Sequence, residues 1–268
     1  MTRAVDAVGS EKIVTVIGSG HWRHLDEPRR LEIPGRIVEQ PENRDTGPGL
    51  FLGLSRGMAA DPDALVAVLP SDHYVSSRRR FATHLRRAFA LAGRLSESIV
   101  LLGVRPDRPE TDYGWIETGG PCWDLPWPAQ PVARFHEKPH PQAAENMMRW
   151  GFLWNTMVMV GRVQAFWELG KRNHPAMMER FEALRASLAR AGGEGSEDPE
   201  LLAELYRGMP AANFSKDLLE KEPGACVSLP LEGLEWCDWG RPERVLETLS
   251  KLGQTPAFPA GSISAPRG

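Results

Sequence analysis

Cysteines are scarce in this chain, and no long apolar run occurs in it. The three cysteines, Cys122, Cys226 and Cys237, form no metal-ligand spacing, and an odd, scattered set suits a reduced compartment better than a disulfide framework. No run of about 18 apolar residues is present, and the first residues carry no apolar core of signal-peptide length. These absences predict a cytoplasmic protein that does not span a membrane.

An excess of charge of one sign is also missing. The 32 basic and 35 acidic residues leave a net charge of −3, which provides no basic face for wrapping nucleic acid. A mononucleotide needs only a local positive pocket. The charge balance therefore argues against a nucleic-acid partner and not against a small anionic ligand.

The chain does have the length and apolar content for a full core. Its 268 residues are 41% hydrophobic, near the upper limit for one α/β domain. We expect one domain over residues 1–252 and a disordered tail over 253–268, which is rich in Pro, Gly, Ser and Ala. Residues 121–131 are expected as a loop and 191–197 as an exposed linker. A homo-oligomer is compatible with these features.

Short apolar runs alternate with helical periodicity. The runs that indicate buried strands are 13–17, 36–39, 64–69, 98–102, 132–135 and 152–160. Helices are predicted over 78–92, 142–150 and 163–171. The alternation predicts a doubly wound, mostly parallel α/β sheet, in which ligands bind beyond the carboxyl ends of the strands.

Five short motifs gain their meaning from their order. They are Pro70–His73 (PSDH), Pro109–Ile116 (PETDYGWI), Phe135–Pro139 (FHEKP), Leu153–Thr156 (LWNT) and Trp236–Gly240 (WCDWG). In this order they resemble the sugar-1-phosphate nucleotidyltransferase family, most closely its mannose-1-phosphate guanylyltransferase branch, from about Val14 to Val245. The resemblance implies a fold of the nucleotide-diphospho-sugar transferase type. It also implies transfer of GMP from GTP to mannose 1-phosphate, with release of pyrophosphate.

Such a reaction brings two anions together, so neutralising charge is its main catalytic need. Mg²⁺ meets that need when one or two carboxylates and phosphate oxygens hold it. By resemblance, Asp72 and Asp238 are these carboxylates, and Asp72 also follows a predicted strand. The alternative for Asp72 is a cap for the helix that follows, and the alternative for Asp238 is a turn residue before a helix starting near Pro242.

The sugar side of the site is expected from three of the motifs. Lys138 ends an apolar strand and could present an ammonium to a phosphate, and the family uses this lysine for the sugar phosphate. The resemblance assigns Glu137 to sugar hydroxyls and the main chain of Gly114 to the sugar. Asn155 is a polar residue in a buried run, so it needs a partner, either a sugar hydroxyl or a neighbouring loop. For Glu137 and Lys138 the alternative is a surface ion pair before a proline turn.

The nucleobase pocket is expected in residues 39–48, which resemble the family's Glu-Pro…Arg-Asn-Thr-Ala-Pro segment. Gln40, Asn43 and Thr46 are the expected base contacts, and helix capping is the alternative for Thr46. Asp45 stands where the family usually has asparagine, and Gly47 where it has alanine. The identity of the base therefore stays open at this point.

The family opens with a Gly-rich, Arg-bearing loop and a Pro-Lys pair that hold the triphosphate, and neither precedes Val14. We therefore expect a sheet without its first strand, an exposed flank of the strand near Val14, and weak transfer by this chain. A non-catalytic nucleotide-sugar-binding or regulatory subunit of the same fold is the alternative. A glycosyltransferase of related fold is disfavoured by the Glu-Lys-Pro and Tyr-Gly-Trp-Ile matches.

Overall fold

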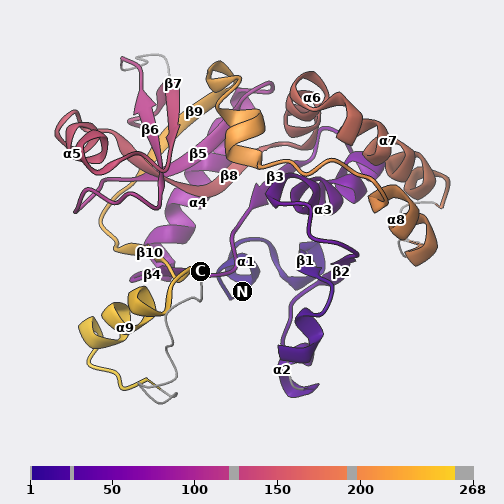
Figure 1. The fold of residues 1–268 in the computed structure, drawn as a ribbon, viewed down its shortest axis with the longest axis horizontal. Helices are drawn as coiled ribbons and strands as arrows, with labels where there is room; N and C mark the ends of the chain where they lie inside the picture. The colour runs from indigo at the N-terminus through magenta and orange to yellow at the C-terminus, as the bar shows by residue number, and fades with distance from the viewer. Residues whose placement is uncertain (1, 25–26, 121–126, 192–197, 257–268) are drawn as a thin grey trace.

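The computed structural model describes residues 2–24, 27–120, 127–191 and 198–256 (Figure 1). Parts of three predicted irregular segments lie outside the described residues: 121–126 of the loop, 192–197 of the linker and 257–268 of the tail. No helix in the described ranges combines the length and apolar character needed to cross a membrane.

A six-stranded sheet forms the centre of the fold. In spatial order its strands are β3 (Leu65–Val68), β8 (Leu153–Arg162), β5 (Ile99–Val104), β9 (Cys226–Leu231), β7 (Gln130–Glu137) and β6 (Gly114–Thr118). The sequence predicted β3, β5, β7 and β8 to within a few residues. It did not predict β9, although β9 is buried along its whole length.

The α/β class is confirmed, but the pairing within the sheet needs a correction. Only β5 and β9 are parallel neighbours, and the other neighbouring pairs are antiparallel. It follows from these pairings that β3, β5, β9 and β6 share one direction, with β8 inserted in the opposite direction between β3 and β5. Most strands therefore point the same way, as expected, but most neighbouring strands are antiparallel, which was not expected. Hydrophobic periodicity identifies a strand and does not determine which strand pairs with it.

Helices cover both faces of the sheet (Figure 1). α4 (Arg78–Arg94) and α5 (Pro141–Arg149) pack on one face. α3 (Thr46–Ala60), α6 (Val163–Asn173) and α7 (Pro175–Arg190) lie over the other, and α8 (Pro199–Tyr206) packs on α7. Along β5, Ile99 and Leu101 enter one apolar core, whereas Val100 and Leu102 enter the other. This alternation is what period-two side-chain geometry requires of a strand buried on both faces.

Two small sheets flank the centre. β1 (Val14–Gly18) runs parallel to β2 (Arg36–Gln40), and β4 (His73–Val75) runs antiparallel to β10 (Trp236–Asp238), which precedes α9 (Pro242–Lys251). Among the described strands only β2 pairs with β1, so one edge of β1 has no ladder partner, as the sequence predicted. α1 (Thr2–Val8) packs on α4. The remaining helical segments are α2 (Glu27–Leu31) and η1 to η4, which lie at Ser10–Lys12, His21–His24, Phe214–Leu219 and Pro223–Ala225.

Candidate functional site

Asp72 and Asp238 are brought together by the β4–β10 pair. Asp238 lies opposite His73 in the ladder, and the Trp239 N–H donates a 2.8 Å hydrogen bond to the carbonyl oxygen of Asp72. The cap alternative for Asp72 is wrong, because the side chain of Ser77 caps α4. The Asp72 side chain is instead 53% exposed.

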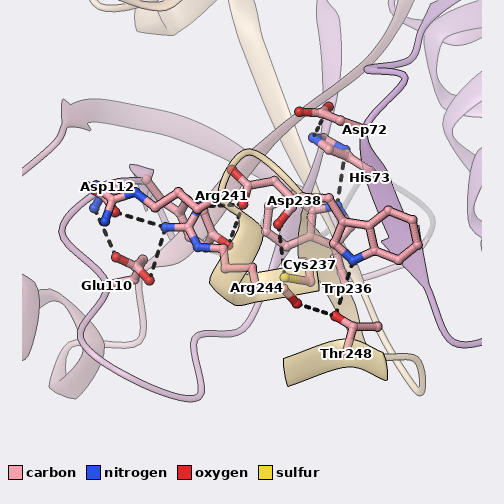
Figure 2. A network of polar contacts seen from close by, with 12 residues as sticks. Asp72, His73, Glu110, Asp112, Trp236, Cys237, Asp238, Arg241, Arg244 and Thr248 are labelled. Atoms are coloured by element: carbon pink, nitrogen blue, oxygen red, sulfur yellow. Dashed lines mark hydrogen bonds and ion pairs between the residues drawn. The ribbon is translucent and has the colours of Figure 1, made fainter. Parts of the chain in front are cut away.

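The carboxylate of Asp238 is held by two donors. Tyr113 donates its phenolic O–H to Oδ1 at 2.9 Å. Nη1 of Arg244 donates to the same oxygen (Figure 2). Asp238 is the last residue of a strand rather than a turn residue, although α9 does begin at Pro242 as predicted. No described residue donates a hydrogen bond to Oδ2 of Asp238.

Arg244 is the centre of this network, and sequence reasoning missed it. Its side chain is only 8% exposed, and its Nη2 lies 3.0 Å from Asp112 Oδ2 and 3.3 Å from Glu110 Oε2. The guanidinium also lies 4.4 Å from the centre of the Tyr113 ring. An arginine on the apolar side of a predicted helix was the available signal, because a buried guanidinium needs carboxylate partners.

A positively charged neighbour of Asp72 comes from α1. Arg3 donates to the carbonyl oxygen of Pro70 at 3.4 Å, lies 5.6 Å from the centre of the Phe81 ring, and is close enough to Asp72 for their charges to interact. Burial lowers the pKa of His73 to about 4, although the charge of Asp72 opposes that change. His73 is therefore neutral at physiological pH, with its Nδ1 accepting from the Trp236 indole at 3.2 Å.

The carboxylate oxygens of Asp72 and Asp238 are ligands of the kind that Mg²⁺ prefers. No cluster of three or more His, Cys, Asp or Glu side chains suited to a metal exists among the described residues. Mg²⁺ does not require one, since it usually takes one or two carboxylates and completes its shell with water and substrate phosphates. An exposed Asp72 carboxylate and the second oxygen of Asp238 supply such a pair.

Gly114, Glu137 and Asn155 meet on the sheet, where β6 pairs with both β7 and β8. A Cβ atom on Gly114 would lie 2.7 Å from Glu137 Oε2 and 3.5 Å from the Asn155 Cβ. The glycine therefore provides the space in which the Glu137 carboxylate lies, which is the close approach that a glycine inside a strand often marks.

Glu137 lies among charges from three segments. Burial raises the pKa of its carboxyl, the ammonium of Lys138 opposes that change, and the carboxylates of Glu220 and Asp45 add to it. Glu220 Oε1 also accepts the Glu137 backbone N–H at 3.1 Å. Glu137 is thus partly buried among acidic neighbours, which does not match the alternative of a surface ion pair. Lys138 itself is exposed.

Asn155 has a partner on its own strand. Its Oδ1 accepts the Met157 N–H at 3.0 Å, where the pairing of β5 with β8 shifts register. Neither expected partner, a sugar hydroxyl or a neighbouring loop, is needed to satisfy that oxygen. The amide nitrogen of Asn155 has only a 3.4 Å contact to the Met157 sulfur, so most of its donor capacity stays available to a ligand.

Backbone strain concentrates around these residues. Among the described residues, the non-glycine residues with positive φ are Asp45, Trp127, Lys138 and Met157. The charges of Asp45 and Lys138 both interact with the Glu137 carboxyl, and Met157 contacts Asn155. Positive φ at such residues costs free energy and tends to persist at binding sites.

A pocket of about 410 Å³ adjoins this region and is lined by Asn43, Asp45 and Thr46. The capping residue of α3 is Asp45 and not Thr46, whose hydroxyl instead accepts the Phe214 N–H at 2.9 Å. Gln40 is buried beside the pocket segment and donates to the carbonyl oxygen of Glu42 at 2.8 Å. Two of the three expected base contacts therefore line the pocket.

The pattern of the Nucleotidyl transferase family matches residues 11–255. This chain belongs to that family. The resemblance to sugar-1-phosphate nucleotidyltransferases is thereby confirmed, with the expected site residues spread along the matched region.

Individual relatives share about a quarter to a third of their residues with the chain. It is 32% identical over 239 residues to the alginate biosynthesis protein AlgA of Pseudomonas fluorescens, covering 87% of the chain and 47% of AlgA. It is 26% identical over 224 residues to a mannose-1-phosphate guanylyltransferase of Escherichia coli, covering 83% of the chain and 46% of that protein. The chain thus spans less than half of the length of these relatives.

Solved structures share the fold. A structure described as mannose-1-phosphate geranyltransferase from Thermus thermophilus superposes with a TM-score of 0.76 at 24% identity, covering 95% of this chain and 68% of that one. A UDP-glucose pyrophosphorylase complexed with UDP-glucose gives 0.55 at 13% identity, covering 94% and 85%. The fold is therefore of the nucleotide-diphospho-sugar transferase type.

Proposed function

We propose that the protein transfers a nucleotidyl group to a hexose 1-phosphate, with GTP and mannose 1-phosphate as the first substrates to test. An oxygen of the sugar phosphate attacks the α-phosphorus of the triphosphate. The bond from that phosphorus to the bridging oxygen breaks, and pyrophosphate leaves with the bonding electrons. The observation that carries the proposal is the meeting of Gly114, Glu137 and Asn155 beside Lys138 in a chain of this family.

The residues on the sugar side have complementary chemistry. The exposed ammonium of Lys138 binds the sugar phosphate as a point charge. The Glu137 carboxylate accepts hydrogen bonds from sugar hydroxyls, and the Asn155 amide donates to them. Gly114 lets the sugar approach the strand because it has no side chain in the way.

The nucleotide side begins at the pocket of Asn43, Asp45 and Thr46. It is an open surface hollow of about 410 Å³. Asp45 and Asn43 can accept hydrogen bonds from a base, which suits the N–H donors of a guanine. The charge interaction between Asp45 and Glu137 supports a nucleotide side that neighbours the sugar side.

Asp72 and Asp238 would hold a Mg²⁺ ion near the phosphates. The ion would neutralise charge on the phosphate oxygens as pyrophosphate leaves. The chain's own contribution is to bring the backbones of the two residues together through the β4–β10 ladder and the Trp239–Asp72 hydrogen bond, and to keep the Asp238 carboxylate oriented. Arg3 adds a positive charge beside Asp72.

Incubation of the purified chain with Mg²⁺, each of four nucleoside triphosphates and a set of hexose 1-phosphates tests the proposal. We expect a nucleotide-sugar and an equal amount of pyrophosphate, measured by chromatography and a coupled pyrophosphate assay. Asp72→Asn serves as the negative control. Absence of product from every pair would contradict transferase activity.

A chain that binds a nucleotide-sugar without making it is the second candidate. It is favoured by one observation, the engagement of Asp238 Oδ1 by both Arg244 and Tyr113, which occupies one of the two oxygens that a metal could use. Calorimetry with GDP-mannose separates the two candidates. Micromolar binding without any turnover would support the binding function.

A further inference from the structure

Arg244 joins the predicted metal carboxylate to a loop far away in the sequence. Its Nη1 contacts Asp238, and its Nη2 contacts Glu110 and Asp112 (Figure 2). We propose that Arg244 is a positioning residue, which fixes the Asp238 carboxylate in the orientation that serves a divalent cation. The inference rests on the proposed function, because it assigns Asp238 to that cation.

The geometry explains why Arg244 can hold a fixed position. The side chain is 8% exposed, and one face of the guanidinium lies against the Tyr113 ring at 4.4 Å. A planar guanidinium with several directed donors restrains its partners more than a lysine ammonium, which is a single mobile point charge. Rotation of Arg244 would break ion pairs with three carboxylates at once.

The same contacts give the two oxygens of Asp238 different surroundings. Oδ1 receives both protein donors, the Tyr113 hydroxyl and Arg244 Nη1, whereas no described residue donates to Oδ2. Oδ2 is therefore the oxygen left for a cation. Partners that orient a metal-ligating carboxylate in this way typically change metal affinity or activity by about 10- to 100-fold when they are altered.

Arg241 offers a matched control from the same helix end. It lies 2.7 Å from Asp112, one of the partners of Arg244, but its side chain is 59% exposed and forms no hydrogen bond or ion pair with Asp238. Exposed ion pairs of this kind contribute little to stability. Arg241→Gln should therefore behave like the wild-type chain.

Two variants test the contact from opposite sides. Arg244→Lys keeps the positive charge and removes the planar guanidinium with its several directed N–H donors. Tyr113→Phe removes one donor to Asp238 Oδ1 and keeps the ring that packs against Trp154 and Trp236. Because Tyr113→Phe deletes a single hydroxyl, it keeps the test valid even if Arg244→Lys fails to fold.

The readout is binding of Mn²⁺ alone, followed by electron paramagnetic resonance of the free ion, with Asp72→Asn to locate the site. We expect Mn²⁺ affinity to fall about 10-fold or more in both variants. In turnover assays, the Mg²⁺ concentration for half-maximal rate should rise while KM for the nucleotide stays near the wild-type value. Arg241→Gln should match the wild-type chain in both measurements.

Wild-type Mn²⁺ affinity in both Arg244→Lys and Tyr113→Phe would overturn the inference. So would an equal loss in Arg241→Gln, a loss of thermal stability without any loss of Mn²⁺ affinity, or a wild-type chain that binds no Mn²⁺. Failure of the proposed function gives a different result. The wild-type chain would then bind Mn²⁺ and transfer nothing, and the comparison of variants would still decide the role of Arg244.

Discussion

Gly114 and Glu137 lie so close together that a methyl group on the glycine would come within 2.7 Å of the Glu137 Oε2. Glu137 lies opposite Gly114 in the β6–β7 ladder, so the contact is set by strand register. The far end of a glutamate can move aside at little cost to the fold. A side chain at position 114 would therefore disturb the site much more than the sheet.

Gly114→Ala should weaken binding of the sugar 1-phosphate about 10-fold or more while the chain stays folded. Calorimetry with mannose 1-phosphate and a thermal melt provide the measurements. Gly93→Ala is the matched control, because its Cβ would lie 3.7 Å from Leu65 Cδ1 in ordinary contact. It should stabilise α4 by roughly 0.5–1 kcal/mol. Unchanged sugar binding in Gly114→Ala would argue against a sugar site at Gly114 and Glu137.

The two predicted metal carboxylates should respond differently to mutation. Asp72→Asn should lower transfer at least 10-fold, about 1.4 kcal/mol, without loss of stability because its side chain is exposed. Asp238→Asn should lower transfer and also the free energy of unfolding by roughly 1–3 kcal/mol, because it weakens hydrogen bonds to Arg244 and Tyr113. Turnover and urea unfolding check both. If Asp72→Asn keeps more than about a tenth of wild-type turnover, its metal role is wrong.

Lys138 combines an exposed ammonium with a strained backbone at φ 45°. Lys138→Ala and Lys138→Gly should each weaken sugar-phosphate binding by roughly 10- to 100-fold, the worth of one charge-assisted contact, and leave nucleotide binding within about 3-fold. Lys138→Gly should also be roughly 1 kcal/mol more stable than Lys138→Ala, because glycine adopts positive φ without strain.

Calorimetry with each ligand and urea unfolding measure these effects. Lys171→Ala removes an exposed lysine whose only ion pair among the described residues is with Glu168, and it should leave the binding of both ligands unchanged. Equal weakening of sugar phosphate and nucleotide by Lys138→Ala would refute the assignment.

His84 should make stability depend on pH. Burial lowers the pKa of this histidine below its ordinary value of 6.5, although the hydrogen bond to the Glu232 carbonyl opposes the change. The unfolded chain therefore takes up the proton at a higher pH than the folded chain does. The contribution of His84 is fully present above about pH 6.5 and is lost as the pH falls below it, at up to roughly 1.4 kcal/mol per pH unit.

Urea unfolding of the wild-type chain and His84→Gln at pH 7.5 and pH 5.5 isolates this contribution. The wild-type chain should lose more free energy of unfolding between the two pH values than the variant does. Equal losses would show that His84 titrates alike in the folded and unfolded chains.

The sequence by itself determined the features that depend on neighbouring residues along the chain. The stripe of Phe81, Leu85 and Ala88 predicted α4, and these residues are buried in the structure. The start of α9 at Pro242 was also predicted, since proline favours the first helical turn. The sequence analysis did not predict β9, which contains Pro230, a residue that is disfavoured in central strands. β7 pairs with β9 only at Val227 and Ser228, so the proline lies past the end of that ladder.

Only the tertiary structure decided which polar groups meet. Arg244 reaches Asp112 across 132 positions, Glu220 reaches Glu137 across 83, and Arg3 reaches Pro70 across 67. Periodicity in a sequence reports which face of a segment is buried and carries no information about what packs against that face. The partners of Asp238 and Glu137 follow from strand order and helix packing, and the burial of Arg244 makes its charge matter.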